Sequence, residues 1–269
     1  MSDASPEIPP DSGLEVRTYF VRSRNVLLAR AEFSSLYVDY YLHLADQGFR
    51  PESDHDAVFK RALAGFVLHA ASRPWNEHIA WTLNLQEPRL NLFLVGDNET
   101  GDVAGRIFTE NVREGERSLF YCDVVRGRAT KRRSAVEFNG NDPLVAAEAF
   151  YAQSEQRIGR FFQTAEEEVV LAVEHPDCDL AWLRDLDVDQ VRRMDDAETV
   201  VLLERRIVRW RCGCSQARML EVLAPVFRTD PEELFGDEQR LEIRCPRCAR
   251  RHIVTREALE AHVAQLPEA

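Results

Sequence analysis

Alternating hydrophobic and polar positions predict a series of short strands in the first 160 or so residues. Seven segments carry the pattern and are rich in β-branched and aromatic residues: VRTYFVRS, NVLLARAEFSS, HIAWTLNLQ, RLNLFLVGD, GDVAGRIFTE, SLFYCDVV and SAVEFNG. Gly, Asn and Asp lie in several of the breaks between them, and a basic turn, RGRATKRR, separates the last two. This arrangement predicts a largely antiparallel sheet.

Two segments of this region have the spacing of helices instead. Apolar residues recur every three or four positions from Ser53 to Ala71, where Ser53 or Asp54 is placed to cap the start. A second helix is predicted in NDPLVAAEAFYAQSEQRIGRFFQ, with Asn141 or Asp142 as cap and Pro143 in the first turn. Residues 14–163 therefore predict an N-terminal α+β domain with helices packed on a sheet.

Residues 164–206 have a different composition. Acidic clusters such as AEEE and MDDAE alternate with apolar residues that include Leu180, Trp182 and Leu186. The segment is too apolar for an inert linker and too charged for a deep core. We expect a metastable helical linker that depends on its neighbours for burial.

Residues 207–269 predict a small separate domain. Ser215 is placed to cap a short helix that Pro225 closes, and Asp230 precedes a Pro-Glu-Glu helix start. RLEIRC and HIVT read as strands, and Thr255 is placed to cap a final helix. With so few apolar positions, the domain needs stabilisation besides its core.

Charge divides the chain in the same place. The net charge is −12 over 269 residues, of which the first 204 carry −14 and the rest +2. Because so acidic a surface repels phosphate backbones, we expect no broad nucleic-acid binding. Hydrophobic residues make up 45%, enough for a buried core.

The ends of the chain bear on its location. Residues 1–13 are acidic and proline-rich, which predicts a disordered tail and is unlike a signal peptide or a mitochondrial presequence. No apolar run approaches the roughly 18 residues of a membrane helix. These features predict a cytoplasmic protein without a membrane partner.

Four cysteines in the last domain form the clearest chemical pattern. Cys212 and Cys214 flank one glycine, and Cys245 and Cys248 follow after a gap of 30 residues. Two close pairs of thiolates brought together by folding are typical of a structural Zn²⁺ site. In a reducing compartment such pairs more often bind metal than form permanent disulfides. We therefore expect Zn²⁺ bound by these four residues.

Three interpretations of this zinc site remain open from the residues themselves. Thiolates are the form that oxidants attack, and their oxidation would remove the metal ligands and unfold the domain. Alternatively, the zinc is purely structural, in a regulatory or binding module with an arginine-rich surface. A thiol oxidoreductase using Cys245 and Cys248 is the third. Arg211, Arg244, Arg247, Arg250 and Arg251 crowd the sulfurs, either tuning their reactivity or only balancing their charge.

The tail resembles the redox-regulated 33-kDa heat-shock chaperone family, which carries CxC, about thirty residues and CxxC. The flanks are similar as well, with Arg-Trp-Arg before Cys212, Ser215 after Cys214 and an Arg-Glu-x-Leu helix start at Arg256. Upstream, the stretch from Tyr151 to Gln156 resembles the family's Tyr-x-x-Ser-Glu-Gln motif. The chain is identified as a divergent member.

The resemblance implies a mechanism and a set of partners. In the reduced state the zinc-bound protein would be folded and inactive. Oxidation would join Cys212 to Cys214 and Cys245 to Cys248 as redox-switch disulfides, release zinc, and unfold the tail and the linker. The exposed surface would then hold unfolding client proteins without ATP, often as a homodimer, during oxidative stress.

The sequence also predicts where the remaining cysteines and His252 lie. Cys122 lies in an apolar strand and is expected in the core, whereas Cys178, in HPDCDL, and His252 are expected at the surface. The sequence contains no nucleophile elbow, phosphate loop or dinucleotide fingerprint, so we expect no enzyme.

Overall fold

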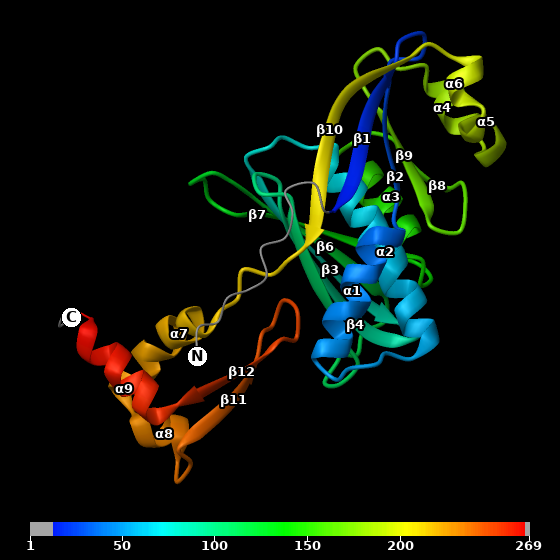
Figure 1. The fold of residues 1–269 in the computed structure, drawn as a ribbon. Helices are drawn as coiled ribbons and strands as arrows, with labels where there is room; N and C mark the ends of the chain where they lie inside the picture. The colour runs from blue at the N-terminus through cyan, green and yellow to red at the C-terminus, as the bar shows by residue number, and fades with distance from the viewer. Residues whose placement is uncertain (1–12, 267–269) are drawn as a thin grey trace. The chain divides into compact units, whose positions relative to one another are not determined.

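The computed structural model describes residues 13–266 and divides at Arg211/Cys212 into two compact units. The first unit is an α+β fold, as predicted (Figure 1). Its strands are β1 (Leu14–Val21), β2 (Val26–Glu32), β3 (Glu77–Gln86), β4 (Arg89–Asp97), β5 (Asp102–Phe108), β6 (Ser118–Arg126), β7 (Arg132–Phe138), β8 (Gly159–Gln163), β9 (Glu168–Glu174) and β10 (Val200–Trp210). Its helices are α1 (Ser34–Asp46), α2 (Ser53–Ala71), α3 (Pro143–Gln153), α4 (Leu180–Asp185), α5 (Val188–Arg192) and α6 (Met194–Ala197).

The ten strands form one sheet in the order β7-β6-β3-β4-β5-β10-β1-β2-β9-β8. Every neighbouring pair is antiparallel except β10 and β5, which are parallel and pair only Arg209 with Asp102 and Trp210 with Val103. The last residues of β10 therefore join the two halves of the sheet, immediately before the second unit begins.

The half of the sheet that contains β2 and β9 is covered on both faces. Along β9, Val169, Leu171 and Val173 belong to the main core with α1, α2 and α3, whereas Val170 and Ala172 belong to a second core with α4, α5 and α6. Successive side chains of a strand point to opposite faces, so the unbroken apolar run of β9 needs cover on each side. The segment α4–α6 covers the second face.

Arginines of the sheet hold this cover in place. Arg24, in the turn after β1, donates to Asp179 at 2.8 Å and to Glu198 at 2.9 Å. Arg30 of β2 makes two bonds with Asp195, at 2.8 and 2.9 Å. Acidic residues of the middle segment therefore attach it to the sheet by ion pairs with these arginines.

The structure corrects several of the sequence predictions, and neither Ser53 nor Asp54 caps α2, whose N-cap is Glu52. The segment 164–206 was predicted to be helical, but only its centre is, because β9 and β10 occupy its two ends. The segment after Pro143 was predicted as one helix, but α3 ends at Gln153 and β8 follows. Helix α1 was not predicted, since its valine and tyrosines are residues that favour strands.

The second unit has two strands, β11 (Arg240–Arg244) and β12 (Arg251–Thr255), paired antiparallel. Its helices are α7 (Gln216–Thr229), α8 (Pro231–Phe235) and α9 (Arg256–Gln265). The predicted caps are confirmed, because Ser215, Asp230 and Thr255 each accept a bond from the first turn of the following helix. Pro225 does not end α7, which continues to Thr229. The tail predicted for residues 1–13 lies outside the described residues apart from Gly13.

Candidate metal centre

The four cysteines lie in two segments of the second unit, one before α7 and one between β11 and β12. Cys212 and Cys214 follow the end of β10, directly before the cap of α7. Cys245 directly follows β11, and Cys248 lies in the turn to β12. The turn is closed by Cys245 N–H donating to Arg250 O at 2.8 Å and by Ala249 N–H donating to Cys245 O at 2.9 Å. Each cysteine pair is therefore fixed by the secondary structure beside it.

The sulfurs have the spacing of a tetrahedral metal site. The Sγ atoms of Cys212 and Cys245 are 3.8 Å apart, those of Cys214 and Cys248 are 3.6 Å apart, and all four lie within 4.8 Å of one another. Four sulfurs at ~2.3 Å from a central zinc ion would lie about 3.8 Å from one another. A disulfide would need about 2.05 Å. The residues are free thiols and fit a metal ion.

The four thiols differ in pKa because they form hydrogen bonds with one another. Hydrogen bonds from the neighbouring thiols lower the pKa of Cys212 to about 7, with Cys214 the largest contributor, and hold the pKa of Cys245 well below its usual value. The same contacts raise the pKa of Cys214 and Cys248. A metal ion would replace these shared protons and hold all four sulfurs as thiolates.

The core around the cluster is small. It consists of the buried residues Met219, Ala224, Phe227, Phe235, Val254 and Leu259, with partly buried neighbours. Because such a small core contributes little net stability, metal binding would supply much of the folding free energy of this unit.

Ala249 in the turn carries backbone strain. Its φ angle is +64°, in the left-handed region that glycine adopts freely and alanine does not. The turn that holds Cys245 and Cys248 is therefore less stable than the same turn with glycine.

Comparison with known proteins agrees with this arrangement. Residues 166–255 match the family model described as Hsp33 protein. The chain is 28% identical over 100 residues to the 33 kDa chaperonin of Caldanaerobacter subterraneus subsp. tengcongensis, a match that covers 35% of this chain and only 34% of that protein. The crystal structure of the 33 kDa chaperonin (heat shock protein 33 homolog) from Thermotoga maritima has the same fold, with a TM-score of 0.70 and 14% identity, over 94% of this chain and 98% of that one. The chain is therefore similar to Hsp33 proteins in sequence over residues 166–255 and in fold over most of its length.

Tyr151 and Glu155, from the stretch 151–156, take part in a polar network of the first unit. His69 is fully buried, and its Nδ1 lies 2.9 Å from the Tyr151 hydroxyl. Burial, with Arg73 and Arg157 nearby, holds the pKa of His69 well below its usual value, so the imidazole is neutral. Sequence reasoning missed His69 because one histidine in an apolar helix carries no motif.

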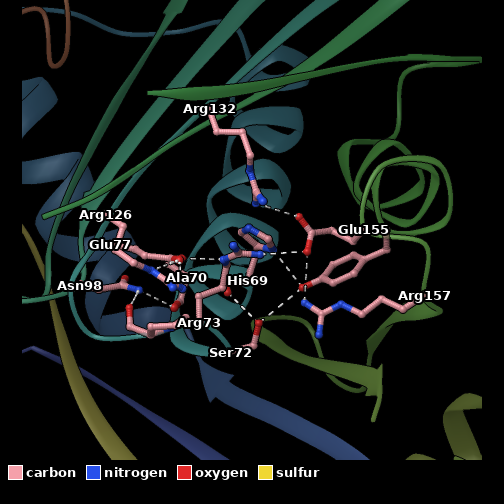
Figure 2. Close-up of polar contacts among 12 residues, drawn as sticks. His69, Ala70, Ser72, Arg73, Glu77, Asn98, Arg126, Arg132, Glu155 and Arg157 are labelled. Atoms are coloured by element: carbon pink, nitrogen blue, oxygen red, sulfur yellow. Dashed lines mark hydrogen bonds and ion pairs between the residues drawn. The ribbon is translucent and has the colours of Figure 1, made fainter. Parts of the chain in front are cut away.

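Ion pairs surround this network (Figure 2). Arg73 donates to Glu77 at 2.7 Å and to Glu155 at 3.1 Å, and Arg126 donates to Glu77 at 2.7 Å. Burial alone would raise the pKa of Glu77, but hydrogen bonds from Arg73 and Arg126 outweigh it and lower the pKa. Glu155 thus anchors the chain after α3 to Arg73, in the connection between α2 and β3.

The basic turn RGRATKRR is largely neutralised by acids of its own unit. Asp123 pairs with Arg133 at 2.7 Å and with Lys131 at 3.5 Å, Glu77 pairs with Arg126, and Glu155 lies 3.6 Å from Arg132. The turn is therefore a structural element of the first unit.

Three other predictions have different outcomes. Cys122 is in the core, as expected, and burial raises its pKa to about 12, which leaves the thiol unreactive. Cys178 was expected at the surface but is half-buried beside the second core. His252 was also expected at the surface, yet it is 9% exposed on the inner face of β12, and its Nε2 has no hydrogen-bond partner among residues 13–266. Among those residues no helix is long and apolar enough to span a membrane.

Proposed function

We propose that this protein is a redox-regulated, ATP-independent holdase chaperone whose reduced state binds Zn²⁺ through Cys212, Cys214, Cys245 and Cys248. One observation supports it above the others: α4–α6 cover an apolar sheet face and directly precede, in the sequence, the strand β10 that leads into the cysteine cluster. The partners would be unfolding client proteins, bound without chemical conversion in the cytoplasm, with a homodimer formed on oxidation.

Zinc is the metal that the donor set favours. Four cysteine sulfurs at tetrahedral spacing, with no carboxylate or imidazole in the cluster, suit Zn²⁺ among the common cellular divalent ions. The ion would hold the thiolates together and stabilise the second unit.

Oxidation by a peroxide would proceed in two balanced steps. A thiolate of one pair attacks the peroxide, becomes a sulfenic acid and releases hydroxide; the second thiolate then attacks the sulfenic sulfur, forms the disulfide and releases a second hydroxide. The pairs Cys212–Cys214 and Cys245–Cys248 follow from the family resemblance. The shortest contacts, Cys212 with Cys245 and Cys214 with Cys248, join the two motifs instead, so disulfide mapping by mass spectrometry tests the pairing.

Loss of the metal would uncover the client-binding surface by destabilising β10. This strand ends two residues before Cys212 and follows α6 directly. When the second unit unfolds, β10 loses its anchor on that side, and the short helices of the middle segment have little stability of their own. Their release would expose the second-core face of the sheet, which consists of Val21, Val26, Leu28, Phe162, Val170 and Ala172.

The proposal is tested by measuring client aggregation beside zinc release over a series of oxidant concentrations. Reduced, zinc-loaded protein should not suppress aggregation, and suppression should rise in parallel with zinc release and reverse with dithiothreitol. Activity that is highest in the zinc-loaded state and lost on oxidation would instead identify a binding module with a structural zinc, an alternative that the exposed arginines of β11 and β12 favour.

A further inference from the structure

The arginines of the second unit lie in a different electrostatic environment from those of the basic turn in the first. Residues 240–255, which form β11, β12 and the turn between them, contain five arginines and one acid, Glu242. Glu242 is shared, since it lies 3.6 Å from both Arg244 and Arg251. Within residues 13–266 no acidic side chain lies within 4.0 Å of Arg247 or Arg250. Positive charge is therefore left over here.

The positive charge of these arginines exceeds the negative charge of the metal centre. Four thiolates with one divalent cation carry a charge of −2. The arginine rim, defined as Arg244, Arg247, Arg250 and Arg251, carries four positive charges, so it stays positive after the metal centre and Glu242 are both balanced. Arg244 and Arg251 are also directly opposite in the β11–β12 pairing, where like charges are unfavourable. Charge balance alone does not account for these residues.

The rim side chains are exposed to solvent. Arg244 and Arg251 have 65% and 62% of their side-chain surface exposed, and Arg247 and Arg250 are exposed as well. The sulfurs differ in access, because Cys245 and Cys248 are buried whereas Cys212 and Cys214 are partly exposed. A small molecule reaching the cluster would meet Cys212 or Cys214 first.

We propose that the arginine rim makes the cysteine cluster selective for negatively charged oxidants, with anionic disulfides as the substrate class. The inference rests on the proposed redox function. A thiolate of Cys212 or Cys214 attacks one sulfur of the disulfide and releases one anionic thiolate; the other cysteine of the pair attacks the mixed disulfide and releases the second. Two protein thiolates and one disulfide thus give one protein disulfide and two free thiolates. Positive charge near the entry site raises the local concentration of an anionic reagent and its encounter rate.

The test compares three disulfides that differ in charge: the dianion dithiobis-nitrobenzoate, neutral dithiodipyridine and dicationic cystamine. Rates of thiol oxidation are measured on the reduced, zinc-loaded full chain at about 20 mM and about 500 mM salt. The variant R247E/R250E is compared with R117E/R89E, which changes the net charge equally on exposed arginines of the first unit.

R247E/R250E should slow the anionic reagent about tenfold at low salt, leave the neutral one within about twofold and speed the cation, and high salt should remove most of these effects. R117E/R89E should change little, and the neutral pair R247Q/R250Q should be intermediate. Zinc content per chain shows whether each variant is folded. Equal changes for all three reagents, or equal effects of the two charge reversals, would overturn the inference. Charge-selective oxidation without any suppression of aggregation would reject the proposed function and leave this inference standing.

Discussion

The indole of Trp210 lies edge-on to the ring of Tyr40, with ring centroids 5.1 Å apart, and Trp210 is only two residues before Cys212. It also contacts Phe59 of α2, at 6.2 Å between centroids. The same residue pairs with Val103 where the two halves of the sheet meet. Trp210 thus fastens the chain to the core of the first unit just before the cysteine cluster begins.

Replacing Trp210 with alanine should weaken this junction. Truncating a partly buried tryptophan removes its packing on Tyr40 and Phe59, and we expect a loss of about 2 kcal/mol in the free energy of unfolding. Urea unfolding of the reduced protein measures it, with zinc content expected to stay unchanged. Trp75→Ala is the control, because Trp75 is half-exposed and should cost less than about 1 kcal/mol. Equal losses in both variants would contradict a special role for Trp210.

Ala249→Gly should stabilise the second unit. The substitution relieves the left-handed strain at φ +64°, and we expect a gain of about 1 kcal/mol and slower zinc loss to a chelator. Ala261→Gly, in the middle of α9, should instead destabilise the unit by about 1 kcal/mol. Zinc transfer to a chromogenic chelator gives both rates. Faster zinc loss from Ala249→Gly than from the wild type would refute the strain argument.

Arg160→Met should loosen the middle segment without affecting the metal. Arg160 Nη1 donates to the carbonyl oxygens of Leu183, Arg184 and Leu186 at 3.1, 2.7 and 2.7 Å, and methionine keeps the stem but removes these bonds. We expect about 1–3 kcal/mol less protection of α4 against hydrogen exchange. The reduced variant should also bind a fluorescent apolar dye.

Arg184→Met is the matched control for this experiment, since the side chain of Arg184 has no hydrogen-bond or ion-pair partner within residues 13–266. It should leave exchange in α4 unchanged. The same exchange in both variants would mean that the Arg160 bonds do not hold the segment.

The stability of the first unit should fall in mild acid. His69 is neutral in the fold because its pKa is lowered, whereas in the unfolded chain it titrates near 6.5. Its contribution is therefore complete above about pH 6.5 and is lost as the pH falls below that value, by up to about 1.4 kcal/mol per pH unit. Urea unfolding between about pH 5 and pH 7.5 should show this slope, and His69→Gln should reduce it. An unchanged slope in the variant would assign the acid sensitivity elsewhere.

Short-range patterns made the cysteine cluster predictable, while dependence on long-range strand pairing limited the prediction of the fold. The spacing of the four cysteines and the caps Ser215, Asp230 and Thr255 are local signals, and the structure brings the sulfurs together as expected. By contrast, β9 and β10 read as helical because their neighbours in the sheet, β2 and β1, lie more than a hundred residues earlier. The exposure of His252 was predicted wrongly for the same reason, because its burial depends on which face of β12 packs inward.

The most direct test of the proposed switch is hydrogen exchange, followed by mass spectrometry, before and after oxidation of the zinc-loaded protein. We predict that α4–α6 and the second unit lose protection together, at the oxidant dose where client binding begins, while β3 and β6 remain protected. Client binding that begins while α4–α6 are still fully protected would contradict it.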